Sequence, residues 1–281
     1  MHIGTLSIPL CKTDIFANPM ASALENWVDC RQAGGKYTFL RQAAIAGSGL
    51  SPEAAKKALQ RLVRRGRIAK AKDYFFVIVP LEYSVAGGPP ASWFVHDLMA
   101  AMGRRYYVGL LTAAALHGAS HHQPQEFQVM TDRPIRPIEV GRARIRFFAT
   151  RFVGDAATTN VKTPTGFMCV ATPETTAVDL VRFRRWVGQL DNVATVIADL
   201  ANRINAHGLL AAVKIVGDLP NAQRLGYILD RVGGRKLTDP LRRWVEHQSP
   251  RPVFLQPTHG DEAKPDRRWH VLVDHPLEIE A

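Results

Sequence analysis

Residues 51–66, SPEAAKKALQRLVRRG, predict a helix whose two ends are both marked in the sequence. Ser51 is a favoured N-cap, Pro52 suits the first helical position, and Gly66 suits the turn that follows the last one. At 100° per residue, the apolar side chains fall in one arc of this helix: Ala55, Ala58, Leu59, Leu62 and Val63. The segment therefore predicts an amphipathic helix that packs through this arc.

The rest of the surface of this helix is basic and carries Lys56, Lys57, Gln60, Arg61, Arg64 and Arg65. A solvated helix face usually mixes charges of both signs, because i,i+4 ion pairs stabilise it. A face of cations without an acid instead favours contact with a polyanion, although a merely solvated face remains the alternative. The whole chain has a net charge of +11. Nucleic acid is the first candidate partner and an anionic membrane surface the second.

The flanking segments predict the rest of a DNA-binding domain. A helix is expected over residues 21–35, with core-facing positions at Leu24, Trp27, Val28 and Arg31. A short helix around Phe39–Ala46 and the turn Gly47-Ser48-Gly49 then lead into the basic helix. Two strands, Arg67–Ala69 and Tyr74–Val79, are expected to turn at residues 70–73. Three helices followed by a hairpin predict a winged helix-turn-helix over residues 1–85.

In a winged helix the basic helix enters the major groove of DNA. Its N-terminal half is expected to reach base edges, through Lys56, Lys57, Gln60 and Arg61. Phosphate contacts are expected from Arg64, Arg65 and Arg67, and contacts to phosphate or the minor groove from Lys70 and Lys72 on the wing. Together with Ser48 of the turn, these are the predicted DNA-binding residues.

A length of 281 residues is enough for two domains. The segment LEYSVAGGPPASW is rich in Gly and Pro and predicts a linker, with the boundary within residues 85–92. For residues 92–281 we expect an α/β or α+β domain in which helices wrap a small mixed sheet. The expected helices are 92–103, 106–118, 172–183, 190–204, 209–217, 221–233 and 240–248, and the expected strands are 126–132, 144–152, 166–172 and 269–274.

No motif in the sequence calls for catalysis, a metal or a cofactor, and we expect none of them. The cysteines Cys11, Cys30 and Cys169 have no C-x-x-C spacing and fit a reducing cytoplasm. No acid or cysteine completes a metal-ligand pattern with the nearby histidines His117, His121 and His122. Glu174 and Asp179 lie five residues apart on one expected helix, so they point to different faces and form no acid/base pair. The sequence has no membrane-spanning apolar run, and we expect a cytoplasmic protein.

The second domain contains two distinctive motifs: Y-Y-x-x-x-L-x-A-x-x-x-H-G at Tyr106–Gly118 and T-P-E-x-T-x-x-D-L at Thr172–Leu180. With the predicted winged helix in front of them, the chain resembles the AbiEi family, the antitoxins of type IV abortive-infection systems. The resemblance implies a repressor that binds inverted repeats in the promoter of its own operon. It also implies that the chain counteracts a toxin with a nucleotidyltransferase fold, mainly through the C-terminal domain.

Several alternatives stay open from the sequence. The motif residues Tyr106, Tyr107, His117, Thr172 and Asp179 are either functional or structural, and ordinary structural roles account for them more simply. The second domain could instead act as a kinase-like enzyme on the toxin, or respond to a small ligand. The sequence lacks a glycine-rich phosphate loop, which argues against the kinase. Residues 250–281 match no expected motif.

Overall fold

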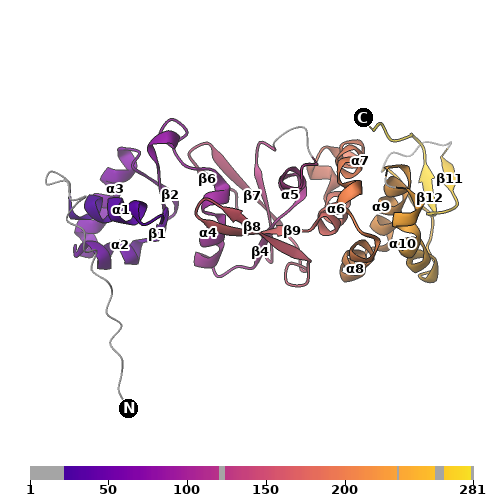
Figure 1. Cartoon of the computed structure of the whole chain (residues 1–281), viewed down its shortest axis with the longest axis horizontal. Coiled ribbons are helices and arrows are strands. Elements are labelled where there is room, and N and C mark those ends of the chain that lie inside the picture. Colours follow the sequence, from indigo (N-terminus) through magenta and orange to yellow (C-terminus); the bar gives the residue numbers. More distant parts are fainter. Residues whose placement is uncertain (1–21, 120–123, 233, 257–262, 280–281) are drawn as a thin grey trace, which may run out of the picture. The chain divides into compact units, whose positions relative to one another are not determined.

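The computed structural model describes residues 22–119, 124–232, 234–256 and 263–279 (Figure 1). Packing divides the chain into two compact units. The first runs to Met102 and includes residues 138–143 and 163–166, and the second contains the rest. Both units combine helices with strands, so the predicted α+β class is confirmed. Cys11, His121 and His122 lie outside the described residues.

The first unit begins with a helix, a strand, two helices and two strands: α1 (Ala23–Ala33), β1 (Thr38–Leu40), α2 (Arg41–Ser48), α3 (Pro52–Arg64), β2 (Ile68–Lys72) and β3 (Phe75–Ile78) (Figure 1). The three strands form an antiparallel sheet in the order β1-β3-β2. The helices and the sheet enclose a core that includes Leu24, Val28, Phe39, Leu59, Leu62 and Phe76.

The basic helix α3 has the predicted ends. The Ser51 hydroxyl accepts a hydrogen bond from the Ala54 amide at 3.3 Å, and Pro52 is the first helical residue. Gly66, just past the helix, has a φ of +69°, which an L side chain adopts only with strain. Ala55, Ala58, Leu59 and Leu62 are buried as predicted, but Val63 is 37% exposed. Its prediction as a core residue was therefore wrong, because Val63 lies at the edge of the apolar arc.

Two other local predictions in this unit were also wrong. Phe39 lies in β1 and pairs with Phe76 of β3, so the helix starts at Arg41 rather than near Phe39. The two rings stack with centroids 5.5 Å apart, and this long-range contact selects a strand. In the hairpin, the turn contains only Asp73 and Tyr74; Lys70 and Lys72 lie in β2, on either side of a bulge.

The segment predicted as a linker packs against the first unit. It contains 3₁₀ turns at Leu81–Tyr83 and Ala91–Trp93 and leads into α4 (Val95–Ala101). The Trp93 ring meets the edges of Tyr37 and Tyr83 at centroid distances of 5.1 and 5.3 Å. Gly141 lies so close to this segment that an added Cβ would sit 2.1 Å from the Ala86 carbonyl oxygen. The compact unit therefore extends past residues 85–92 to Met102.

A mixed six-stranded sheet has the order β6-β7-β5-β4-β9-β8. Its central strand β4 runs antiparallel to β5 and parallel to β9, and β5 runs parallel to β7. In chain order the strands are β4 (Tyr106–Val108), β5 (Phe127–Thr131), β6 (Ile138–Val140), β7 (Ala143–Ala149), β8 (Thr158–Thr163) and β9 (Gly166–Ala171). Tyr106–Val108 was predicted as the start of a helix, and that prediction was wrong. The helix α5 (Leu110–Leu116) begins only after Gly109.

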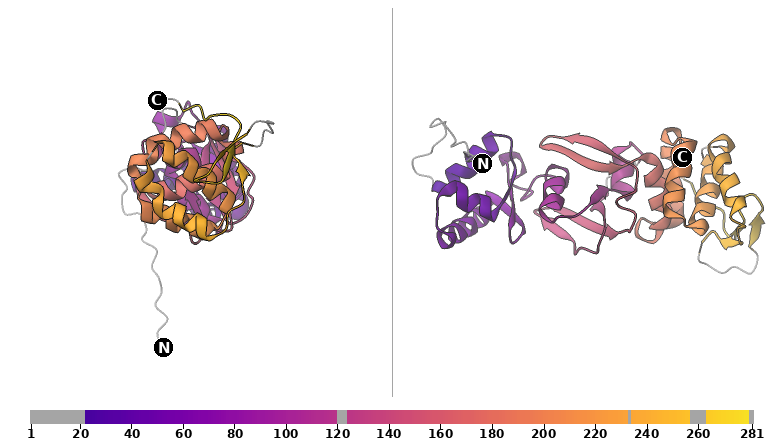
Figure 2. Two further views of the ribbon diagram at one scale, coloured as in Figure 1. Left: turned by 90° about the vertical axis from the view of Figure 1, so that its right-hand side faces the viewer. Right: turned by 90° about the horizontal axis from the view of Figure 1, so that it is seen from below.

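The remaining helices are α6 (Pro173–Arg182), α7 (Gln189–Leu200), α8 (Ala206–Val216), α9 (Leu219–Val232) and α10 (Arg235–His247), with 3₁₀ turns at Arg184–Trp186 and Ala201–Arg203. α6 and α10 each pack against both α8 and α9, as the orange helices of Figures 1 and 2 show. α10 starts five residues before its predicted start at Pro240, which lies inside the helix. In the described part of the chain, no helix is both long and apolar enough to cross a bilayer.

A small sheet of the order β10-β12-β11 completes the second unit, formed by β10 (Val253–Phe254), β11 (Lys264–Asp266) and β12 (Val271–Val273). Trp269, between β11 and β12, is fully buried. Its ring lies against α9 at Gly226, where an added Cβ would meet ring carbons at 2.2 Å. Residues 250–281, which match no expected motif, thus provide a core side chain for the C-terminal helices.

Candidate nucleic-acid interface

Helix α3 presents its basic face to solvent. The helix rests on the core through its four buried side chains, and this fixes the direction of the others. Lys56, Lys57, Gln60, Arg61 and Arg64 are all exposed, as the helical spacing predicted. The structure therefore brings together five of the predicted site residues on a single surface.

Most of the cations on this face have no acidic partner. Arg65 faces Glu25 at 3.6 Å, but the arginine side chain is 65% exposed and the pair is weak. In the described part of the chain, no acidic oxygen lies within 4.0 Å of the charged groups of Lys56, Lys57, Arg61 or Arg64. Like charges one turn apart on a helix repel each other. Glu53 in the first turn is the one acid of this helix and forms no ion pair with these cations, so the face carries an excess of positive charge.

The wing carries the next two predicted residues. Lys70 is exposed, and its Nζ lies 3.1 Å from the Asp73 carboxylate in the turn. Lys72 is half-buried next to this turn. The turn has two residues where four were predicted, and β2 is correspondingly longer, so both lysines lie in β2 and not at the tip of the hairpin. Ser48 ends α2, and its hydroxyl accepts a 3.5 Å hydrogen bond from the Leu50 amide, a local turn contact.

Arg67 lies in a different environment from the other cations. Its Nη2 donates to Asp29 Oδ1 at 2.6 Å and to the Gln32 side chain, and its Nη1 donates to the Val79 carbonyl at 3.3 Å. The guanidinium thus ties α1 to the end of β3 and is engaged within the unit. The predicted phosphate contact from Arg67 does not fit this position. Asp29 and Gln32 are 38 and 35 residues away in sequence, so no local pattern points to them.

A groove of about 430 Å³ separates α3 from the wing. We call it the α3 groove; it is lined by Arg41, Lys56, Leu59, Gln60, Val63, Arg64, Lys70, Asp73 and Phe76. Arg41 is a site residue that the sequence did not reveal. It is the first residue of α2, and its guanidinium donates to the Asp73 carbonyl, which places a further cation at the rim.

The motif residues of the second unit hold secondary-structure elements together. Tyr107 of β4 donates a 2.6 Å hydrogen bond to the buried Asp179 of α6, and Arg182 contacts the other oxygen of Asp179 at 2.8 Å. Burial raises the pKa of Asp179, while the contacts from Tyr107 and Arg182 oppose this rise. The adjoining cavity measures about 10 Å³, enough for about one water molecule. This buried network has no room for a substrate.

The other motif residues also have structural partners. The His117 ring contacts the Ala171 carbonyl at 2.7 Å, and the Tyr106 hydroxyl accepts from the Cys169 amide at 3.3 Å. Thr172 caps α6, and Glu174 accepts two hydrogen bonds from Asn205, at 3.0 and 2.6 Å. Glu174 and Asp179 therefore have separate partners, as their spacing predicted. Over the described residues, no group of three or more His, Cys, Asp or Glu side chains could hold a metal ion.

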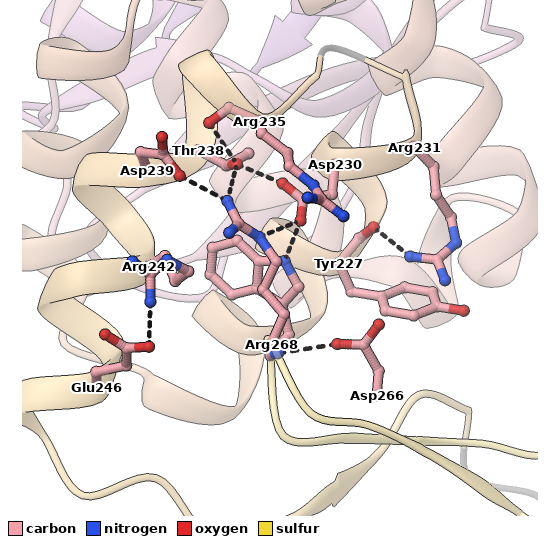
Figure 3. A network of polar contacts seen from close by, with 11 residues as sticks. Tyr227, Asp230, Arg231, Arg235, Thr238, Asp239, Arg242, Glu246, Asp266 and Arg268 are labelled. Carbon is pink, nitrogen blue, oxygen red and sulfur yellow. Dashed lines mark hydrogen bonds and ion pairs between the residues drawn. The ribbon is translucent and has the colours of Figure 1, made fainter.

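A second arginine cluster lies at the C-terminal end of the second unit (Figure 3). We call it the Asp230 network, and it consists of Asp230, Thr238, Asp239, Arg268 and Trp269. Asp230 accepts hydrogen bonds from Arg268 Nε at 2.6 Å, from the Trp269 indole at 2.8 Å and from the Thr238 hydroxyl. Arg268 Nη2 reaches Asp239 at 2.7 Å. Each charged group of this network faces a partner, which anchors Trp269 on α9.

Comparisons with known proteins show what parts of this chain are similar to. No curated protein matches the chain. The crystal structure of the RV2827C protein from Mycobacterium tuberculosis is similar, with a TM-score of 0.64 and 13% identity over 89% of this chain and 90% of that one. At this identity the similarity establishes the fold alone. The family model of the AbiEi antitoxin C-terminal domain matches residues 107–231, which span nearly all of both motifs. Residues 107–231 thus match the AbiEi antitoxin C-terminal domain.

Proposed function

We propose that this protein is a DNA-binding autorepressor and type IV antitoxin of the cytoplasm. It binds inverted repeats in the promoter of its own operon and represses that operon. It also counteracts a partner toxin with a nucleotidyltransferase fold. The first activity belongs to the N-terminal unit, and the second belongs to the AbiEi domain at residues 107–231.

The uncompensated cations of α3 carry the DNA-binding half of the proposal. The element order α1-β1-α2-α3-β2-β3 with the sheet order β1-β3-β2 is that expected for a winged helix-turn-helix, in which α3 is the recognition helix. Exposed cations without acidic partners lose no ion pair when they meet phosphate, and they release counterions from the DNA. A merely solvated helix would gain nothing from leaving Lys56, Lys57, Arg61 and Arg64 unpaired.

The proposed contacts follow the direction of the side chains. Lys56, Lys57, Gln60 and Arg61 reach base edges, and Arg64 and Arg65 contact phosphate. Lys70 and Lys72 contact phosphate or the minor groove from β2 of the wing. Arg67 and Ser48 are left out, because their side chains have structural partners within the unit.

The test is a binding titration on the DNA directly upstream of the gene, at several salt concentrations. Affinity should fall steeply with salt, because each phosphate contact adds about one to the slope of log K against log salt. Replacing both Lys57 and Arg61 with alanine should weaken binding severalfold and reduce this slope. The matched control replaces Lys214 and Arg243, two exposed cations of the second unit, with alanine. It removes the same charge and should leave binding nearly unchanged.

Two results would contradict the DNA-binding proposal. One is the absence of binding by the wild-type protein at moderate salt. The other is an equal loss of affinity in the α3 variant and in its control, because the net charge would then matter more than its position on α3. Far-UV circular dichroism of both variants shows whether the fold is retained.

The family match of residues 107–231 supports the antitoxin half of the proposal. Expression of the product of the neighbouring toxin gene should arrest growth, and co-expression of the full-length chain should restore it. The double alanine variant at Lys57 and Arg61 should still restore growth when both genes are driven from a foreign promoter, because both substitutions lie outside the matched residues. Continued growth arrest in the presence of the wild-type chain would contradict the antitoxin role.

We propose that the antitoxin domain acts without catalysis. The tight packing around Tyr107 and Asp179 supports this, since the adjoining cavity holds only about 10 Å³. Incubation of the two purified proteins with labelled ATP tests the kinase-like alternative, and no label should reach the toxin. A small molecule that stays bound to the protein through purification would instead favour a ligand-responsive domain.

A further inference from the structure

Val63 is an apolar side chain on an otherwise basic surface. It is 37% exposed, whereas Leu59 and Phe76, the other apolar residues of the α3 groove, are each only 3% exposed. Among the apolar residues that line this groove, Val63 is therefore the most accessible to a ligand. A single exposed valine is common on protein surfaces, so its surroundings decide what it means.

The groove around Val63 is lined mainly by cations. Lys56 and Arg64 line it from α3, Arg41 from α2 and Lys70 from the wing. The one carboxylate among the lining residues belongs to Asp73, and it faces Lys70 at 3.1 Å. The lining therefore combines an accessible apolar spot with an excess of positive charge, which suits a segment of DNA.

Gln60 lies directly beside Val63. The two residues are three positions apart on α3, so they are neighbours on one side of the helix, and both line the α3 groove. A glutamine amide can bond both N6 and N7 of adenine. The thymine of the same or the next base pair carries a 5-methyl group, the apolar group that distinguishes thymine in the major groove. Gln60 and Val63 thus match the two bases of a T·A pair or of a short A/T step.

We propose that Val63 is a specificity-determining residue that contacts a thymine methyl group, next to an adenine bound by Gln60. This inference rests on the proposed DNA binding and adds to it the base pair that the α3 groove selects. Of the cations of the groove, Arg41, Arg64 and Lys70 hold the phosphates on either side. A G·C pair in this position offers no methyl group, so the Val63 side chain stays uncovered.

The experiment compares two forms of the same upstream DNA, one amplified with dTTP and one with dUTP. Uracil pairs like thymine but lacks the 5-methyl group, so the comparison needs no knowledge of the operator sequence. Wild-type protein should bind the uracil form about fourfold more weakly for each methyl group contacted, the equivalent of about 0.8 kcal/mol. The variant Val63→Ala should bind both forms with nearly the same affinity. Alanine favours helices, so α3 should be retained.

Val85→Ala is the matched control. Val85 belongs to the first unit, is 84% exposed and lies outside the α3 groove. This variant should keep the wild-type preference for thymine DNA. Lys57→Ala should weaken binding to both forms by the same factor, because it removes a charge and no methyl contact.

The outcomes separate the two proposals. If wild-type protein binds the thymine and uracil forms equally well, the role of Val63 is overturned while DNA binding stands. If Val63→Ala keeps the wild-type preference, the methyl groups are read elsewhere, and this inference again fails. Absence of binding to either form would overturn both proposals.

Discussion

The basic face of α3 and the Asp230 network both contain basic side chains, but these are unpaired on α3 and paired with carboxylates in the network. In the network, Arg268 reaches two carboxylates at 2.6 and 2.7 Å, and it helps to hold a fully buried tryptophan in place. On α3, four exposed cations have no acidic partner among the described residues. A paired cation stabilises the fold, whereas a set of unpaired like charges destabilises it slightly. The presence of cations that lower stability is explained if they serve a function, and binding to a polyanion is such a function.

Asp230→Ala should have the largest effect on stability. The substitution removes the acceptor shared by Arg268, Trp269 and Thr238. The indole N–H of the fully buried Trp269 loses its partner, and the Arg268 guanidinium keeps only its contact with the more exposed Asp239. We expect a loss of about 3 kcal/mol in the free energy of unfolding, measured by denaturant titration. The control Asp132→Ala disrupts a looser pair with Arg104 at 3.5 Å and should cost less than about 1 kcal/mol. Equal costs would remove the distinction between the network and an ordinary surface pair.

Arg67→Ala and Arg64→Ala compare a paired and an unpaired arginine within one unit. The loss of the Arg67 contacts to Asp29, Gln32 and Val79 should destabilise the first unit by about 1 kcal/mol, since Asp29 remains partly exposed. Its DNA-binding salt slope should stay unchanged. Arg64→Ala should do the reverse, with little change in stability and a slope reduced by about one. A reduced slope in Arg67→Ala would restore Arg67 to the DNA surface.

Arg61→Gln should raise stability slightly. Arg61 lies one turn from Lys57, Arg64 and Arg65, so its removal relieves like-charge repulsion of about 0.3 kcal/mol per pair, and glutamine has a similar helix propensity. The gain should be measurable by thermal unfolding at low ionic strength and should disappear in high salt. A loss of stability at low salt would show that Arg61 has a partner after all.

Asp239→Asn should have the smallest effect on stability, and the size of this effect should depend on pH. The hydrogen bond from Arg268 lowers the pKa of Asp239 below its ordinary value of about 3.9. A lowered folded pKa stabilises the protein above the ordinary value, and this contribution is lost as the pH falls through the folded pKa. The difference in Tm between wild type and Asp239→Asn should therefore be present at pH 5 to 7 and shrink below about pH 4. A difference that stays constant down to pH 2 would contradict this role of Arg268.

Features set by local sequence could be predicted well. Both ends of α3 and the exposure of its basic face follow from Ser51, Pro52, Gly66 and a spacing of 3.6 residues. The cap of α6 at Thr172 follows in the same way. Each of these depends on residues within a few positions of one another, so no knowledge of distant contacts was needed.

Features set by distant contacts could not be predicted. β1 contains only three residues directly before α2, and it becomes a strand because Phe39 pairs with Phe76, 37 positions later. β4 likewise depends on Met130 and Val170 of its neighbouring strands. In the candidate site, the contacts of Arg67 could not be predicted because its partner Asp29 lies on α1, and Arg41 was missed because only folding brings it beside the wing.

The burial of Trp269 has a consequence for synthesis of the protein. The core residues of the α1-to-β3 segment lie within residues 24–78. The core of the C-terminal helices also needs Trp269, which is synthesised about 190 residues after residue 78. At roughly 5–20 residues per second, a ribosome needs about 10–40 s to cover that interval. A nascent chain thus has the residues that place the α3 surface well before it has the last core residue of the second unit.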